Sequence, residues 1–192
     1  MQQTKEIHTQ PHTIDLSKYT TGGYQPGPFW KVMLWYPFNY FLLHSSLPWP
    51  SSLKVFVLRL FGARVGKIVV IKPRVRIKYP WKLSIGNYTW LGEDVWIDSL
   101  DTVDIGSNVC LSQGVMLLTG NHDYTDTEFA LRLGQITLQD GVWIGAKAVV
   151  CPGVTCHYSS VLTVNSVATK DLDAMSIYSG NPATFRRLRK SN

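Results

Sequence analysis

The sequence predicts a mainly β protein that folds as a parallel β-helix, and the first observation behind this prediction is a six-residue repeat. Between residues 138 and 168 an aliphatic or small residue returns at every sixth position. An α-helix would repeat its apolar residues at three and four, and a half-buried strand at two. A period of six is typical of coils in which each hexapeptide forms one flat side with its first residue pointing to the axis. These predicted inward residues are Leu138, Ile144, Val150, Cys156, Leu162 and Ala168.

The second observation is that the same period runs through the preceding part of the chain, with two-residue shifts between triplets of repeats. Three hexapeptides make one triangular coil, so each shift predicts a slightly longer corner. The shifts fall between Ile77 and Ile85 and between Ile97 and Ile105. The upstream inward residues are Val65, Ile71, Ile77, Ile85, Leu91, Ile97, Ile105, Leu111 and Leu117.

The third observation is a glycine directly after several inward residues, at Gly86, Gly92, Gly106 and Gly145. We expect sharp corners there, because glycine adopts unusual backbone angles at little cost. An ordinary β-sandwich with coincidental spacing is the alternative, but it would show alternation and hairpin dipeptides, which are sparse in this chain.

A stack of coils has exposed ends that need covers, and both termini of the repeat region supply candidates. Residues 28–62 predict a helical, aromatic-rich cap, in which Ser51 is expected as a helix N-cap and Gly62 as a helix stop. At the other end Asn181-Pro182 predicts the start of a short basic helix within residues 179–192. The β-helix is expected over residues 63–178.

Residues 1–27 form a polar extension without the apolar segment of a signal peptide, so we expect a cytoplasmic protein. The run 29–43 is interrupted by Lys31 and Asn39 and is shorter than a membrane span. Three cysteines without C-x-x-C spacing favour neither a disulfide framework nor a zinc site, and Cys156 is expected as a small core residue.

The chain has a formal net charge of +6, and its basic residues are clustered. No nucleic-acid-binding motif accompanies them, so we expect no nucleic-acid partner. A phosphorylated cofactor, an anionic glycan, a membrane surface or simple solvation of a basic face remain as explanations. The clusters comprise Arg64, Lys67, Lys72, Arg74, Arg76, Lys78 and Lys82, and then Arg186, Arg187, Arg189 and Lys190.

The repeat breaks once, between Leu117 and Leu138, and this excursion over residues 118–137 carries a single histidine, His122. A long loop that interrupts a regular solenoid is usually functional. Imidazole titrates near neutrality and can take a proton from an alcohol. We therefore expect His122 to be catalytic.

The repeats resemble those of the hexapeptide-repeat acyltransferases, in particular the branch of galactoside, maltose, xenobiotic and colanic acid acetyltransferases. The resemblance covers about residues 30–190. It is carried by the segments 79–81 (YPW), 112–114 (SQG), 119–124 (TGNHDY), 140–146 (DGVWIGA), 167–171 (VATKD) and 179–183 (SGNPA).

This resemblance implies a left-handed β-helix, although parallel crossovers are otherwise nearly always right-handed. It also implies a homotrimer that transfers an acetyl group directly from acetyl-CoA, without a metal ion, to a sugar or glycan hydroxyl in exopolysaccharide or capsule biosynthesis. His122 matches the general base of the family. The positions that match the coenzyme A site are Trp143, Ala146, Val164, Thr169, Lys170 and Arg187.

The chain departs from the family pattern at three positions. A second cofactor-binding arginine is replaced by Thr184, for which Arg186 or Arg189 can substitute. Two acceptor-binding polar positions of the galactoside branch fall on Gly92 and Leu100, which argues against a galactoside acceptor. Nearby polar residues that we expect to bind a sugar acceptor are Glu93, Asp98, Asp101 and Asn121.

Three other functions share this fold. A γ-type carbonic anhydrase needs three histidines around zinc, and His8, His12, His44 and His157 show no suitable pairing with His122. A non-catalytic scaffold would not need the histidine-bearing excursion. An N-acetyltransferase acting on an amino-sugar nucleotide stays open, because one imidazole can activate either an oxygen or a nitrogen.

The aromatic segment 29–49 lies next to the first basic cluster in the sequence. Covering the end of the β-helix is one role for it. Because aromatic residues beside positive charge also favour the headgroup layer of an anionic membrane, we expect weak peripheral association with the inner face of the membrane. This association should decrease in a triple alanine variant of Lys72, Arg74 and Arg76.

Overall fold

The computed structural model describes residues 13–190, and two compact units make up this part of the chain. The larger unit comprises residues 26–120 and 133–190, and the smaller one comprises residues 13–25 and 121–132. His8 and His12 lie outside the described residues. Within residues 13–190 no helix is long and apolar enough to cross a bilayer.

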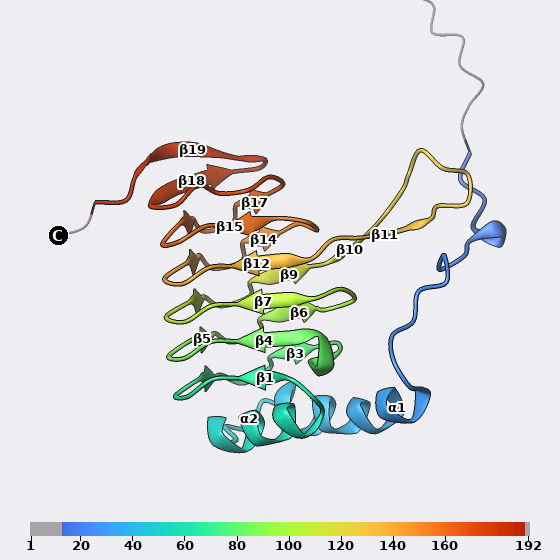
Figure 1. Cartoon of the computed structure of the whole chain (residues 1–192), viewed down its shortest axis with the longest axis horizontal. Helices are drawn as coiled ribbons and strands as arrows, with labels where there is room; N and C mark the ends of the chain where they lie inside the picture. Colours follow the sequence, from blue (N-terminus) through green and yellow to red (C-terminus); the bar gives the residue numbers. More distant parts are fainter. Residues whose placement is uncertain (1–12, 191–192) are drawn as a thin grey trace, which may run out of the picture. The chain divides into compact units, whose positions relative to one another are not determined.

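The larger unit is a parallel β-helix of about six coils, as the six-residue period predicts, and it is left-handed, as the family resemblance implies (Figure 1). Its three sides are parallel sheets of very short strands. The first sheet holds β1 (Arg64–Val65), β4 (Leu83–Ile85), β7 (Val103–Ile105), β12 (Ile136–Leu138) and β15 (Thr155–Cys156). The second holds β2 (Val70–Ile71), β5 (Trp90–Leu91), β8 (Cys110–Leu111), β13 (Trp143–Ile144), β16 (Val161–Leu162), β18 (Ser176–Gly180) and β19 (Ala183–Leu188). The third holds β3 (Arg76–Ile77), β6 (Trp96–Asp98), β9 (Met116–Leu118), β14 (Val149–Val150) and β17 (Val167–Ala168).

Every predicted inward residue is buried, and residues of successive coils stack in register along the axis. Ile85 pairs with Ile105, and Ile105 pairs with Leu138, so one column of aliphatic side chains runs through the first sheet. Cys156 is also buried in this core, and burial raises the pKa of its thiol to about 12. The first long corner, between Ile77 and Ile85, contains a short 3-10 turn, η3 (Pro80–Lys82).

The glycines after the inward residues serve a different purpose from the one predicted. Their φ angles are not in the left-handed region; the positive φ values belong to residues two places later, such as Asp94 (59°) and Lys147 (56°). A Cβ atom on Gly145 would lie 2.6 Å from the backbone nitrogen of Val164 in the next coil. Glycine is therefore required because consecutive coils approach closely.

Residues 28–62 form the predicted helical cap: α1 (Phe29–Phe38), the π-helical turn η2 (Asn39–Leu43) and α2 (Ser51–Leu60). The two α-helices lie beyond β1 at the start of the stack (Figure 1). Trp35, Leu43 and Leu58 are fully buried against the first coil. Gly62 ends the second helix as predicted, with φ of +97° and its N–H donating to the carbonyl of Arg59.

The cap also bonds to backbone groups of the first coil, which has no preceding coil to pair with. The indole of Trp35 donates to the carbonyl of Ile77 (2.9 Å) on the third sheet. On the second sheet, Ser51 Oγ accepts from the N–H of Ile71 (3.0 Å), and Lys54 Nζ donates to the carbonyls of Ile71 (3.2 Å) and Lys72 (3.0 Å). On the first sheet, Arg59 donates to the carbonyl of Val65.

The prediction of Ser51 as an N-cap was wrong, because Pro50 occupies that position and Ser51 is the first helical residue. Its hydroxyl bonds to the β-helix rather than to its own helix.

The prediction of a C-terminal basic helix was also wrong. Residues 183–188 form the strand β19, which pairs antiparallel with β18 after a turn at Asn181-Pro182. An unpaired edge of β18 would expose backbone donors and acceptors, and pairing with β19 satisfies them. This tertiary demand overrides the weak local preference that predicted a helix.

The buried Lys54 provides a test of the hydrogen bonds between the helical cap and the first coil. Lys54→Met keeps the length of the side chain but leaves the carbonyls of Ile71 and Lys72 without this donor. We expect the apparent free energy of unfolding to fall by about 1–3 kcal/mol, which is the usual cost of leaving buried polar groups unsatisfied. Urea denaturation at fixed protein concentration measures the change. Lys67→Met, at an exposed position, is the control; a Lys54→Met protein as stable as this control would contradict the proposed role.

Candidate functional site

The excursion that breaks the repeat forms a two-stranded sheet of β10 (Gly120–His122) and β11 (Leu131–Leu133). The tip of this hairpin and residues 13–25 make up the smaller unit. Within it, the N–H of Asp15 donates to the carbonyl of Thr127 (2.9 Å), beside the 3-10 turn η1 (Leu16–Lys18). The tip of the loop is therefore held in part by residues 13–25.

His122 is oriented within this unit by two neighbours that the sequence did not reveal. Its Nδ1 lies 3.0 Å from the carbonyl oxygen of Phe129, and its ring stacks on the Phe129 ring, with centroids 4.3 Å apart and planes 4° from parallel. Tyr19 contacts the histidine ring at 5.6 Å between centroids. A carbonyl only accepts hydrogen bonds, so Nδ1 carries the proton and Nε2 of the neutral ring is left as an acceptor.

An ion pair between Asp123 and Arg132 closes the hairpin beside the histidine. The Asp123 carboxylate lies 2.7 Å from the Arg132 guanidinium and also accepts hydrogen bonds from Thr125. The Thr125 hydroxyl and then Arg132 lower the pKa of Asp123 to about 2. Asn121 is exposed, and its side-chain oxygen accepts from the N–H of His122 (2.8 Å).

A groove on the second sheet of the larger unit brings together three of the predicted coenzyme A residues. Trp143, Ala146 and Val164 line this groove of about 420 Å³. The indole of Trp143 is half-exposed and donates to Ser112 Oγ (3.0 Å). Ser112 and Gln113 also line the groove, although the sequence assigned them no role. Gly145 also lines the groove, at a position where the close approach of the coils leaves no room for a side chain.

Arg187 belongs to the same sheet as this groove. The register runs from Trp143 to Val161, from Val161 to Ile177, and from Ile177 to Arg187, whose side chain is exposed. Thr169 and Lys170 are exposed at the corner after β17 on the third sheet, outside the residues that line the groove.

The two candidates to replace the missing family arginine differ in their contacts. Arg189 donates to the carbonyls of Gly141 and Ser159, and so holds the end of the chain against the coils. Arg186 donates to the hydroxyl of Ser179 (2.6 Å) in the neighbouring strand. Arg186 is the more exposed of the two and is the better candidate.

The structure does not bring the predicted acceptor carboxylates of the larger unit into one pocket. Glu93 lines a groove with Lys72, Trp90 and Ser112, whereas Asp98 lines another with Tyr40 and Arg76 among its walls. Each carboxylate already has a partner.

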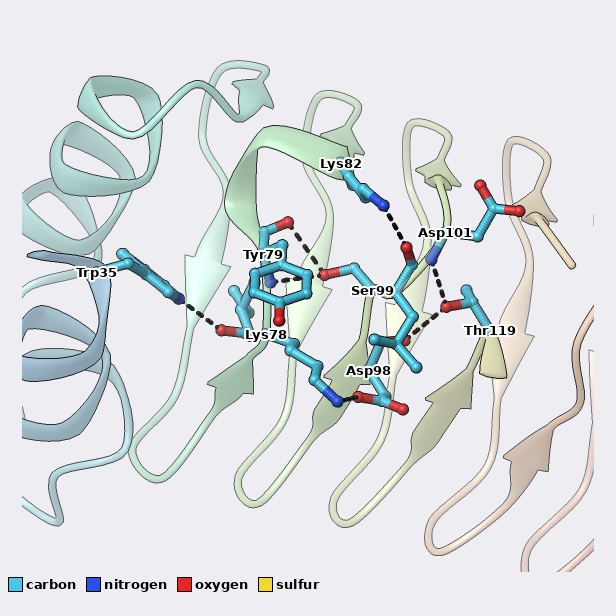
Figure 2. A network of polar contacts seen from close by, with 10 residues as sticks. Trp35, Lys78, Tyr79, Lys82, Asp98, Ser99, Asp101 and Thr119 are labelled. Atoms are coloured by element: carbon cyan, nitrogen blue, oxygen red, sulfur yellow. Dashed lines mark hydrogen bonds and ion pairs between the residues drawn. The ribbon is translucent and has the colours of Figure 1, made fainter. Parts of the chain in front are cut away.

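Figure 2 shows one of these partners, Lys78, which lies 3.1 Å from the Asp98 carboxylate; in the same view the backbone N–H of Asp101 donates to the Thr119 hydroxyl. The carboxylate of Asp101 accepts from the N–H of Thr102 (2.7 Å). Glu93 has the longest contact, 3.6 Å to Arg74, and remains half-exposed.

Metal chemistry has no obvious site in this part of the molecule. Among residues 13–190 no group of three or more histidine, cysteine, aspartate or glutamate side chains is placed to hold a metal ion.

The three-sided parallel β-helix matches the fold of hexapeptide-repeat acetyltransferases, and comparison with known proteins identifies the family. The chain is 37% identical over 176 residues to the colanic acid biosynthesis acetyltransferase WcaF of Escherichia coli, covering 91% of this chain and 97% of that protein. It is 30% identical over 157 residues to the galactoside O-acetyltransferase of Escherichia coli, covering 80% and 75% of the two chains. The chain therefore belongs to the hexapeptide-repeat acetyltransferase family.

A solved structure agrees with this assignment. Galactoside acetyltransferase in complex with coenzyme A superposes with a TM-score of 0.75 at 27% identity, covering 83% of this chain and 81% of that one. No protein-family model matches the chain.

The ion pair of the hairpin provides a test of the local order around His122. Asp123→Asn removes the contact with Arg132, so we expect faster amide hydrogen exchange across residues 121–132. Because the pKa of Asp123 is lowered, its stabilisation is complete above the ordinary pKa of 3.8 and is lost as the pH falls through about 2. The difference between wild type and variant should therefore persist from pH 7 to pH 4. Glu128→Gln, which changes an exposed carboxylate of the same loop, is the control. Equal exchange rates in both variants would show that the ion pair between Asp123 and Arg132 does not order the hairpin.

Proposed function

We propose that the protein is an acetyl-CoA-dependent O-acetyltransferase that acts on a hydroxyl of a sugar or glycan intermediate in exopolysaccharide biosynthesis. The similarity to WcaF over nearly its whole length supports the reaction and the substrate class. The observation that carries the proposal is the orientation of His122, whose Nδ1 is held by a backbone carbonyl so that Nε2 is the free base.

The reaction follows from this tautomer. Nε2 of His122 takes the proton of the acceptor hydroxyl as its oxygen attacks the carbonyl carbon of the thioester. The new O–C bond forms, the C–S bond breaks, and the imidazolium returns its proton to the departing thiolate. Phe129 stabilises the charged ring through its carbonyl, which accepts from the Nδ1 proton in both states.

The acyl donor is assigned to the groove on the second sheet. In this proposal the amide-containing arm of the donor lies along the groove, where main-chain groups of Ala146 and Val164 would bind it and Trp143 would pack against it. Thr169, Lys170 and Arg187 would hold the phosphate end, because the last two are exposed cations outside the groove. Arg186 is proposed as the substitute for the missing family arginine.

For the acceptor, Glu93 is the strongest of the four candidates. Its contact with Arg74 is long, and its side chain is half-exposed beside Trp90 in a groove of about 340 Å³. Asp98, Asp101 and Asn121 remain proposed acceptor residues, but each has a closer partner inside the protein.

We also propose that the enzyme works as a homotrimer in the cytoplasm, where acetyl-CoA is made, with a fraction at the inner face of the membrane. The helical cap offers the surface for that peripheral contact. Light scattering after size exclusion should give the mass of three chains.

Replacing the base tests the catalytic proposal. His122→Ala should lower the rate of acetyl transfer by about a hundred- to ten-thousandfold, because general-base catalysis contributes that much. The assay incubates acetyl-CoA with a panel of sugars, amino sugars and lipid-linked glycans, and mass spectrometry with hydroxylamine treatment separates O-acetyl from N-acetyl products. His157→Ala is the control. Near-normal rates in the His122 variant would show that the proton goes elsewhere, and an exclusively N-acetylated product would overturn the acceptor class.

Removing positive charge from the donor end should act on binding alone. Lys170→Ala and Arg187→Ala should raise the Michaelis constant for acetyl-CoA several-fold and leave that for the acceptor unchanged, because both cations would contact only the donor. The wild-type constant should also rise with ionic strength, since phosphate contacts are screened. Arg64→Ala, a highly exposed arginine at the other end, is the matched control. A change confined to the acceptor constant would refute the assignment.

A further inference from the structure

The helical cap exposes far more apolar surface than it buries. In α1 only Trp35 is buried, while Phe29 and Trp30 are 78% and 64% exposed. We call the exposed apolar residues of this segment the cap surface: Phe29, Trp30, Met33, Leu34, Tyr36, Phe38, Tyr40, Phe41, Leu47, Trp49, Leu53, Phe56 and Leu60. Covering the first coil explains the buried side of the cap but gives no reason for this surface, and large exposed apolar patches usually mark a contact.

A groove between the helices lies within the cap surface. It has a volume of about 330 Å³ and is lined by Phe38, Phe41, Leu42, Trp49, Leu53 and Val57, with Pro37 at its edge. The indole nitrogen of Trp49 donates to the backbone carbonyl of Phe41 (3.2 Å), which orients the Trp49 side chain in the wall of the groove. The groove presents almost no polar group to a ligand, so an apolar partner is required.

The positive charge of the same part of the molecule indicates that its partner is negatively charged. Residues 26–92 contain ten lysines and arginines and no aspartate or glutamate, whereas the rest of the chain has nine basic and thirteen acidic residues. The chain is thus polarised, with its positive charge on the cap and the first coil. A partner that binds this end of the molecule must carry both apolar groups and negative charge.

Individual contacts show which of these charges are available. Arg74 is held by Asp94 at 2.8 Å and by Glu93 at 3.6 Å, and Lys78 is held by Asp98. Lys54 is buried. Lys67 and Lys72, by contrast, are exposed. The triple variant suggested by the sequence would therefore remove one arginine whose charge is already neutralised, and Lys67 with Lys72 is the better pair.

We propose that the cap surface binds an anionic lipid bilayer, with its aromatic side chains in the headgroup layer and the free lysines near lipid phosphates. Tryptophan, tyrosine and phenylalanine favour this interfacial depth. Each lysine or arginine near an anionic leaflet adds about a fivefold gain in binding. A second copy of the chain is a poorer occupant, because pairing two cap surfaces would bring two uncompensated positive regions together. The inference concerns binding alone and does not depend on the acetyl transfer proposed above.

Vesicle sedimentation with the purified full-length chain tests this proposal without acetyl-CoA. The wild type should sediment with vesicles that contain phosphatidylglycerol and phosphatidylcholine, and not with phosphatidylcholine alone. Binding should weaken as salt rises, because surface charges are screened. Lys67→Gln/Lys72→Gln should weaken it by more than tenfold at low salt.

The apolar contribution is tested by Phe41→Ser/Leu53→Ser, which changes two residues at the groove. This variant should lose most vesicle binding at every salt concentration. Tyr88→Ser/Tyr158→Ser, which removes two exposed aromatics outside the cap, is the matched control and should bind like the wild type. Tyr40→Ser/Phe56→Ser is a second cap variant, with both side chains more than 60% exposed, in case the first does not fold.

Three results would overturn the proposal. The first is absence of wild-type binding to phosphatidylglycerol vesicles at low salt. The second is equal binding of the cap variants and the control variant. The third is a concentration-dependent increase in mass, seen by sedimentation velocity and abolished by the cap substitutions, without vesicle binding, which would assign the cap surface to a second copy of the chain.

Discussion

The open edge of the first coil is the constraint on which the rest of the structure depends. Each later coil satisfies its backbone groups with the coil before it, but β1, β2 and β3 have no such partner. A buried unpaired backbone group is costly, so other side chains must reach all three sheets. The cap does this with Arg59, Lys54 and Trp35, one for each sheet. The positions of α1 and α2 are thereby fixed by these polar contacts together with their buried side chains such as Leu58, which leaves the apolar residues of the cap surface facing outward.

The same stacking also shapes the donor groove. Coils that lie close enough to share backbone hydrogen bonds leave no room for a side chain at Gly145 or Gly92, whose Cβ atoms would lie 2.6 Å and 2.8 Å from backbone atoms of the next coil. Gly145 lines the same groove as Trp143 and Val164. The absence of a side chain at Gly145 is therefore a consequence of the stacking of the coils.

The sequence predicted the β-helix well because inward burial repeats with the period, and each inward residue can be recognised without its neighbours. It failed where the outcome depends on a distant partner. Residues 183–188 were expected as a helix, but the free edge of β18 recruits them as a strand. His122 was singled out as a candidate because it lies on the excursion that interrupts the period, whereas its neighbours Phe129 and Arg132 were not, since their contacts depend on how the hairpin closes. The acceptor carboxylates were likewise predicted from residue type and position, and the sequence does not show which basic residues they contact in the fold.

In the proposed reaction, the base and the donor site depend on different parts of the fold. The base is prepared inside the hairpin, where a local carbonyl selects the tautomer of His122, and the donor site is built from the coils themselves. The proposed acceptor residues, by contrast, are outward side chains such as Glu93, which lines a groove with Trp90 and is not part of the core. On this proposal, substitutions there should change acceptor specificity while the fold and the transfer chemistry stay the same.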